Sequence, residues 1–346
     1  GSHGHRHARR RLPGRRPERG ATECGEGAGA GPHAVGDVPR EPHGLGGQGM
    51  QVDRVHVTRH RRVGPAEVFG QAPQQGIVFA NGAAPGDAYT NASTSNQGQA
   101  VGSSGWYYNN VRNGGVAGID NSFARSGNGS VHMSGVAGPV GSSFKADIEY
   151  LANGTAVGGN YYANGSLGLF STFTGMSYDW YRSSSSTNNA GQHPALRILL
   201  DLDGNLNTTG DRGGLVYELA YNGGGSVATD TWVSAVVDAS TKLWNFGLGL
   251  GNEFDIDLDG TPYDLLSEWQ SSGRLANAVI LGFSAGVGSG WGPFDGAVDN
   301  IAWTIDGVTT TTNFEVAGAA VPEPASLALV GLALGGLAMT RRRKPT

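Results

Sequence analysis

The sequence predicts an all-β fold, an antiparallel β-sandwich of jelly-roll type, for residues 77–316. This stretch is dense in Gly, Ser, Thr and Asn, and short runs of strand-forming residues are separated by turn-forming ones. Apolar and polar residues alternate over 195–199 and 215–219, as in strands with one buried face. No regular succession of strand and helix patterns indicates βαβ units, so the strands are expected to pair antiparallel.

The expected elements follow one another along the chain, each bounded by turn signals. About 240 residues suffice for one large core. One short helix is expected at 263–271. Strands are expected at 130–134, 144–151, 168–173, 176–182, 195–201, 214–221, 231–237, 243–248, 279–287, 298–305 and 310–316.

The N-terminal region, residues 1–76, differs sharply from this body. Residues 1–70 hold 12 of the 24 Lys and Arg residues and 7 of the 9 His residues, with no apolar run of signal-peptide length. Three interpretations remain open: a basic nucleic-acid-binding arm, a His-rich metal-binding tract at residues 1–7, and a disordered or non-native stretch. We favour the last and leave this region out of the fold.

Charge and cysteine content exclude several classes of function for the body. Residues 71–320 contain 21 acidic and 8 basic residues, so they offer no basic surface for nucleic acid. The single cysteine, Cys24, lies outside the body. Neither a disulfide nor a thiol nucleophile is therefore expected there.

The C-terminal segment has three parts. Pro322, Glu323 and Pro324 end a linker that begins at residue 317, and an uncharged, largely apolar run fills residues 325–339. The prolines favour an extended, accessible backbone. A basic cluster placed after an apolar run belongs on the cytoplasmic side of a membrane. Residues 325–346 are thus expected to form a short transmembrane helix and a basic tail, which contains Arg341, Arg342, Arg343 and Lys344.

This three-part order resembles the PEP-CTERM sorting signal of bacterial surface proteins. The resemblance implies an exosortase, a membrane cysteine protease, as a partner. It also implies transient anchoring in the inner membrane, followed by transfer to the cell surface or the exopolysaccharide matrix. The body resembles a domain that recurs in such proteins and looks like concanavalin-type and carbohydrate-binding sandwiches. The stretches that carry this resemblance are 176–187, 194–200, 229–233, 287–303 and 312–315.

Closely spaced aspartates mark two candidate metal sites, for which calcium is the expected cation. Asp255, Asp257 and Asp259 alternate on a turn, with Asp264 nearby, and carboxylate oxygens are the ligands that calcium prefers. The alternative is a solvated acidic turn. The second and weaker candidate has similar chemistry but is also a plain turn signal between strands. It consists of Asp201, Asp203 and Asn205, with Asp211 beyond.

Sugar binding requires exposed aromatic rings beside polar side chains. Trp291 in a Gly-rich loop, and Tyr181 with Arg182 before a Ser-rich loop, are the candidate ligand-binding residues. The alternative is that these aromatic rings fill or cover the core.

Catalysis is not expected. The glutamates of the body show no spacing that selects a glycosidase pair, and only His132 and His193 could serve a triad. The prediction is an exported, non-catalytic structural protein. The alternatives are a calcium-dependent exopolysaccharide-binding module and, least favoured, a glycan hydrolase.

Overall fold

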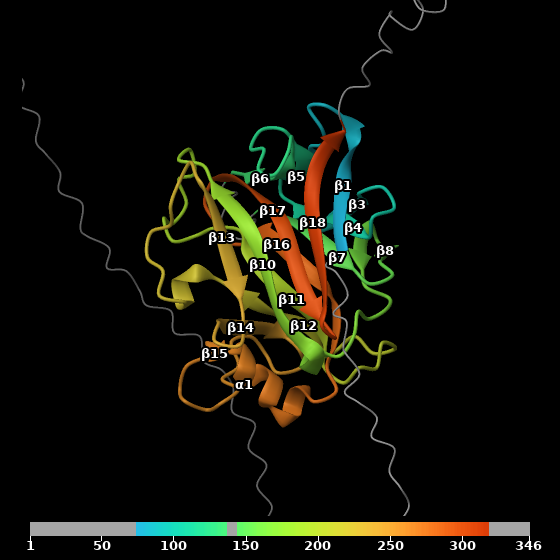
Figure 1. Ribbon diagram of the computed structural model, residues 1–346, viewed down its shortest axis with the longest axis vertical. Coiled ribbons are helices and arrows are strands. Elements are labelled where there is room, and N and C mark those ends of the chain that lie inside the picture. The colour runs from blue at the N-terminus through green and yellow to red at the C-terminus, as the bar shows by residue number, and fades with distance from the viewer. Residues whose placement is uncertain (1–73, 137–143, 318–346) are drawn as a thin grey trace, which may run out of the picture. The chain divides into compact units, whose positions relative to one another are not determined.

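A computed structural model of the protein describes residues 74–136 and 144–317. Within these residues the fold is mostly β, with two main eight-stranded sheets, one of them curled into a half-barrel (Figure 1). The predicted β body is therefore confirmed, and its jelly-roll or concanavalin-like type stays a prediction. Most of the N-terminal region, the sorting residues and the expected C-terminal helix lie outside the described residues.

Sheet A is built around the long strand β17. Its strands are β1 (Gln74–Ala83), β2 (Tyr89–Asn91), β5 (Gly115–Asp120), β6 (Ser130–Gly135), β10 (Phe173–Arg182), β13 (Trp232–Val237), β17 (Phe294–Ile305) and β18 (Val308–Ala317). One edge of β17 pairs with β10 along most of its length. The other edge pairs with β6 up to Val298 and with β18 from Ile301. The sheet therefore divides at β17 into two branches.

Sheet B is a continuous ladder in the order β15-β14-β12-β11-β16-β7-β4-β3. A separate hairpin, β8 (Thr155–Val157) with β9 (Asn160–Tyr162), lies outside both sheets. The strands of sheet B are β3 (Gln97–Ala100), β4 (Trp106–Arg112), β7 (Lys145–Leu151), β11 (Ala195–Asp201), β12 (Arg212–Tyr217), β14 (Lys242–Gly247), β15 (Asp264–Leu265) and β16 (Val279–Val287).

One pairing departs from the antiparallel prediction. β1 runs parallel to β18, with Gln74 opposite Thr310 and Phe79 opposite Glu315. Antiparallel pairing is imposed where a short turn joins two strands, whereas parallel strands need a long connection. Nearly the whole body lies between β1 and β18 along the chain, so no short turn joins them. The local sequence therefore does not determine their relative direction.

The two sheets share one hydrophobic core. Trp106 of β4 in sheet B packs edge-on against Phe314 of β18 in sheet A, with ring centroids 4.9 Å apart. Trp303 of β17 stacks on Phe283 of β16 at 4.6 Å. Aromatic pairs of this kind add to the stabilisation from buried area. Large side chains thus tie the two sheets together across the core.

Three expected elements differ in type from the structure over part of their length. The strand expected at 214–221 ends at Tyr217 as β12, and its last residues form a 3-10 helix. The strand expected at 168–173 is largely a loop with a short 3-10 helix, η1 (Phe170–Thr172), because the backbone N–H and side-chain hydroxyl of Thr172 both donate to the Leu169 carbonyl. Such local bonds compete with a strand ladder. The helix expected at 263–271 is shorter: α1 spans Leu266–Ser271, since the preceding residues form β15. Two further 3-10 helices are η2 (Leu219–Tyr221) and η3 (Gly273–Leu275).

Candidate functional site

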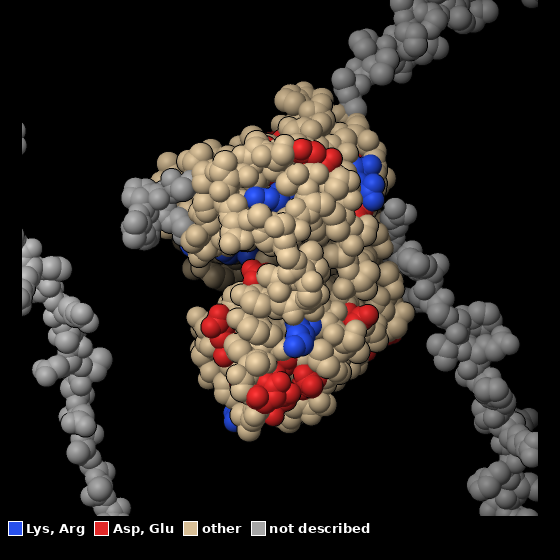
Figure 2. Space-filling model, turned by 90° about the vertical axis from the view of Figure 1, so that its left-hand side faces the viewer, with Lys and Arg blue, Asp and Glu red and all other residues tan. Residues whose placement is uncertain are grey.

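A cleft of about 500 Å³ lies on the face of sheet B that points away from the core. Side chains alternate along each strand: on β11, Ile198 lies in the core, whereas Arg197 and Leu199 line the cleft. Figure 2 shows the body hollowed at mid-height. We call this site the polar cleft. Its other polar and aromatic lining residues are Asn109, Asn110, Lys145, Glu149, Asn160, Tyr161, Tyr162, Arg212, Glu218, Trp244, Phe246, Ser289 and Trp291.

An ion-pair network forms the floor of the polar cleft. Asp147, fully buried on β7, contacts Lys145 of the same strand and accepts a hydrogen bond from Arg197 Nη1 at 3.1 Å. Arg197 also donates to Ser284 Oγ of β16 at 3.2 Å. Three neighbouring strands of sheet B therefore hold the floor, which fixes both cationic side chains in place.

Two asparagines of β4 anchor the second carboxylate of this network. Asn109 donates to Glu149 Oε2 at 2.6 Å, and Asn110 donates to Glu149 Oε1 at 2.8 Å. Asn110 also donates to Asp147 Oδ2 at 3.2 Å and has a backbone φ of 52°. Asparagine adopts this left-handed conformation more readily than most residues. The conformation of β4 thus brings both amides onto one carboxylate.

Burial and charge set the ionisation of this network. Burial raises the pKa of Glu149, and the charge of Asp147 raises it further. Burial opposes the ionisation of Asp147, but Lys145 and Arg197 outweigh it and lower its pKa. Burial also lowers the pKa of Lys145. Asp147 therefore keeps its negative charge, and Glu149 is the first of the two carboxylates to take up a proton as the pH falls.

Aromatic side chains line the polar cleft. The backbone of Tyr161 is clamped by Asn109, which donates to its carbonyl at 2.8 Å and accepts from its N–H at 2.9 Å. The Tyr161 ring also stacks on Tyr107, with centroids 4.3 Å apart. Trp244 lines the cleft from β14, and its indole N–H opposes the rise that burial causes in the pKa of Glu218, another lining residue. The cleft thus combines ring faces with hydrogen-bonding groups.

Of the three candidate ligand-binding residues, only Trp291 lines the polar cleft. Trp291 packs edge-on against Phe294, with ring centroids 5.5 Å apart. Arg182 is buried and donates to Asn188 Oδ1 at 2.6 Å, so it braces a loop. Tyr181 stacks on Phe123, with ring centroids 4.7 Å apart. Neither Tyr181 nor Arg182 is a lining residue of the cleft.

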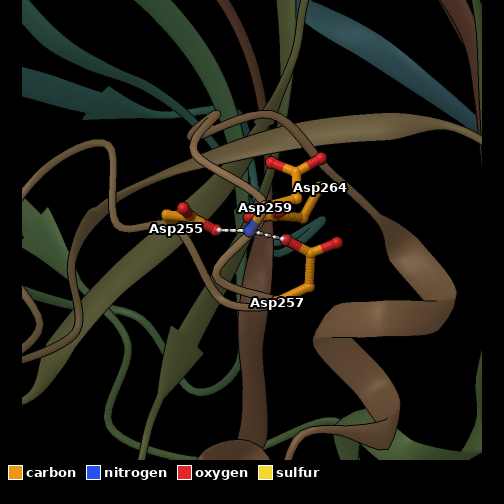
Figure 3. A group of neighbouring side chains, drawn as sticks. All are labelled: Asp255, Asp257, Asp259 and Asp264. Carbon is orange, nitrogen blue, oxygen red and sulfur yellow. Dashed lines mark hydrogen bonds between the residues drawn. The ribbon is translucent and has the colours of Figure 1, made fainter.

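The four aspartates of the first metal candidate do come together. Asp255, Asp257, Asp259 and Asp264 each place one carboxylate oxygen within 4.8 Å of the others. In Figure 3 the Asp259 backbone nitrogen lies between Asp255 and Asp257 and donates to both, at 3.2 and 2.9 Å. Acidic side chains gather at this end of the body, which carries β15 and α1 (Figure 2). We call this segment the 255–264 loop.

Backbone groups already occupy much of the 255–264 loop's carboxylate surface. Asp255 Oδ2 accepts from the N–H of Gly260 at 2.8 Å, and Asp264 Oδ2 accepts from the N–H of Ile256 at 3.0 Å. Burial raises the pKa of Asp264 to about 6, helped by the charges of Asp257 and Asp255. The arrangement is therefore a self-braced acidic turn that could also hold a metal ion.

The second metal candidate lies in the loop between β11 and β12, here the 201–211 loop. Asp201, Asp203 and Asp211 each place one carboxylate oxygen within 4.8 Å of the others. Asp201 is fully buried, and its Oδ2 accepts from Arg212 Nε at 3.2 Å. Burial and the charge of Asp211 raise the pKa of Asp201, although Arg212 and the Gly204 N–H oppose the rise. The third predicted residue, Asn205, donates its backbone N–H to Asp203 Oδ1 at 2.7 Å.

Sequence reasoning missed most of the polar cleft. From sequence, the glutamates of the body, which include Glu149 and Glu218, show no spacing that selects a pair, and nothing marks the asparagines of β4. The available signal was the spacing of Lys145, Asp147 and Glu149, three charged residues at every second position of an otherwise apolar strand. Such a pattern places all three on one face.

The fold and the cleft define a β protein with a polar, aromatic-lined surface site. The model of the PEP-CTERM protein-sorting motif matches residues 320–344 of the chain. This motif implies an exported protein that an exosortase processes and sorts. No curated protein matched the chain at a significant level. In the part that the structure describes, no helix is long and apolar enough to span a membrane.

Proposed function

We propose that this exported protein binds a polysaccharide in the polar cleft and retains it at the cell surface or in the extracellular matrix, without catalysis. The observation that carries the proposal is the composition of the cleft lining. Tyr161, Tyr162 and Trp244 offer rings, beside amides, guanidinium groups and carboxylates. Sugars present hydroxyl groups to hydrogen-bonding side chains and C–H faces to aromatic rings, so this lining suits them.

The state of Glu149 favours binding over hydrolysis. A glycosidase needs two carboxyl groups that flank the scissile bond, one as an acid and the other as a base or nucleophile. Both oxygens of Glu149 already accept amide hydrogen bonds from Asn109 and Asn110. Glu218 is the other acidic residue of the lining. The purely structural role predicted from sequence becomes the conclusion if the cleft binds no glycan.

Calcium is the cation we propose for the 255–264 loop and the 201–211 loop. Their donors are carboxylate oxygens on surface turns, which suit calcium better than the nitrogen and sulfur ligands that zinc prefers. Carbohydrate binding in the polar cleft does not itself require a metal, because the cleft residues supply the hydrogen bonds.

The test measures binding of the full chain to cellohexaose, alginate and xanthan by isothermal titration calorimetry. Tyr162→Ala and Trp244→Ala remove rings from the cleft lining and are expected to weaken binding about threefold to tenfold, the effect of losing about 0.7–1.4 kcal/mol. Tyr181→Ala and Trp232→Ala are matched controls, since neither residue lines the cleft. Their affinity should stay that of the unmodified chain.

Two results would overturn the proposal. The first is the absence of binding to every polysaccharide of the panel, which favours the structural role. The second is an equal loss of affinity in the control variants, which places the binding surface elsewhere. Release of reducing ends from a bound polysaccharide would instead show a hydrolase.

A further inference from the structure

A lysine amine and a side-chain amide meet at one oxygen in the floor of the polar cleft. Lys145 Nζ of β7 contacts Asp147 Oδ2, and Asn110 Nδ2 of β4 donates to the same oxygen at 3.2 Å. The pairing of β4 with β7 is irregular between Asn109 and Arg112, where Asn110 has its positive φ of 52°. Two neighbouring strands thus hold a nucleophilic group and a carboxamide next to each other.

Lys145 has the surroundings of a reactive amine. Its side chain is 19% exposed. Burial lowers the pKa of Lys145 and the charge of Arg197 adds to this effect, whereas Asp147 opposes it. A lower pKa raises the share of the neutral amine, the form that can attack a carbonyl carbon. The Asp147 carboxylate in contact with Nζ can accept the proton that the amine loses.

The carboxamide of Asn110 is polarised by its neighbours. Its Oδ1 accepts from Asn160 Nδ2 at 3.1 Å and from Asn96 Nδ2 at 3.3 Å. Donors in this position stabilise the negative charge that develops on a carbonyl oxygen when its carbon is attacked. The oxygen of Asn110 is therefore bound by two amides, while its nitrogen faces two carboxyl groups, those of Asp147 and Glu149.

Glu149 is placed to donate a proton to the leaving nitrogen. Its Oε1 lies 2.8 Å from Asn110 Nδ2, which is within reach of proton transfer. Burial raises the pKa of Glu149, and the charge of Asp147 raises it further, so its protonated form is more populated than that of an ordinary glutamate. Asn109 donates instead to Glu149 Oε2 and to the Tyr161 carbonyl, so Asn110 is the amide that shares an oxygen with Lys145.

We propose that Lys145 and Asn110 form an intramolecular isopeptide bond that joins β7 to β4. The neutral amine attacks Asn110 Cγ, the Nζ–Cγ bond forms and the Cγ–Nδ2 bond breaks. One proton passes from Nζ to Asp147, and Glu149 supplies one to Nδ2, which leaves as ammonia. Return of the proton from Asp147 to Glu149 restores both carboxyl groups, so the reaction needs no oxidant, cofactor or second protein.

Such a bond would brace the floor of the polar cleft covalently. It would join two strands of sheet B in a body whose residues 71–320 contain no cysteine for a disulfide. The bond does not depend on polysaccharide binding, and its test needs no ligand.

Mass spectrometry of the full chain tests the proposal. The intact mass should be lower than that of the sequence by one ammonia molecule. After protease digestion, the peptide that contains Lys145 should be joined to the peptide that contains Asn110. Lys145→Arg and Asn110→Ala should each show the full mass of their sequence and no joined peptide. Glu149→Gln, which removes the proton donor, should form the bond at least about tenfold more slowly.

Lys242→Arg is the matched control, because Lys242 is exposed on β14 and does not line the cleft. This variant should keep the loss of ammonia. The proposal is overturned if the unmodified chain has the full mass of its sequence and no joined peptide, a result that requires no variant to fold. It is also overturned if the loss of ammonia persists in Lys145→Arg, because an asparagine has then cyclised on its own backbone.

Discussion

His132 and His193, the two histidines among the described residues, lie in opposite environments. His132 bridges two carboxylates, with Nδ1 2.9 Å from Asp120 and Nε2 2.7 Å from Asp295. Burial lowers its pKa, but the hydrogen bonds and charges of both aspartates raise it to about 9. Burial lowers the pKa of His193 to about 4, and its Nε2 accepts from the Leu219 N–H.

The two histidines should therefore give stability a maximum in the neutral range. The raised pKa of His132 contributes stability that is complete below pH 6.5 and is lost as the pH rises through about 9. The lowered pKa of His193 removes stability as the pH falls from 6.5 towards about 4, since the unfolded chain then binds more protons. We expect His132 to raise the free energy of unfolding by roughly 1–3 kcal/mol at pH 6. The lower end of this range is expected, because Asp295 is partly exposed and solvent screens its charge.

Two measurements check this expectation. An NMR pH titration of the imidazole C–H signals should place the two transitions far apart, on either side of the ordinary value. Urea unfolding at pH 6 and pH 9.5 should show a loss of stability that is absent in His132→Gln. Titration of both rings near pH 6.5 would contradict the assigned environments.

At the scale of single residues, the sequence indicated the candidate metal sites but not the polar cleft. The aspartates of the 255–264 loop are close in sequence, so a single turn brings their side chains together. The Asn109–Glu149 bond joins residues 40 positions apart, on β4 and β7. Their proximity depends on strand pairing and register, which residue spacing does not encode.

At the scale of secondary-structure elements, Gly286 of β16 leaves the space that Asp147 occupies in the ion-pair network of β7. It pairs with Asp147, and a Cβ atom at this position would lie 1.7 Å from Asp147 Oδ1. Gly286→Ala should therefore displace Asp147 from Arg197 and lower the free energy of unfolding by about 1–3 kcal/mol or more. Urea denaturation measures this change.

Gly225→Ala is the control for this substitution. A Cβ atom at Gly225 would meet nothing within 4 Å, and its backbone does not adopt a positive φ. Its unfolding midpoint should stay within experimental error of the unmodified chain. A similarly small effect of Gly286→Ala would show that the network tolerates a shift of Asp147.

Strands were predictable where apolar residues recur along the segment. The ranges expected for β11 and β16 match the structure, and most later strands differ only at their ends. The strands from β1 to β5 and the short strands β8, β9 and β15 were missed. Segments such as Gln97–Ala100 and Gly115–Asp120 are rich in Gly, Gln or small residues, and their strand conformation comes from their neighbours in the sheet. Strand propensity depends strongly on such context.

For the molecule as a whole, the fragment 74–317 is predicted to fold by itself. It contains both sheets and their shared core. We expect a single cooperative urea transition, followed identically by fluorescence and far-UV circular dichroism. A fragment that begins at residue 84 lacks β1 and should unfold at lower urea, since Val78 and Ala80 are buried. Separate transitions in the two probes would contradict one cooperative body.

The parallel pairing of β1 with β18 has a consequence for the timing of export. β1 is the first strand of the body, yet its neighbour in the sheet is the last one. A chain that crosses a membrane from its N-terminal side delivers β18 last, and β1 must wait unpaired until then. The sorting motif begins at residue 320, just after β18 ends at Ala317. Closure of the sheet and arrival of the sorting motif therefore nearly coincide.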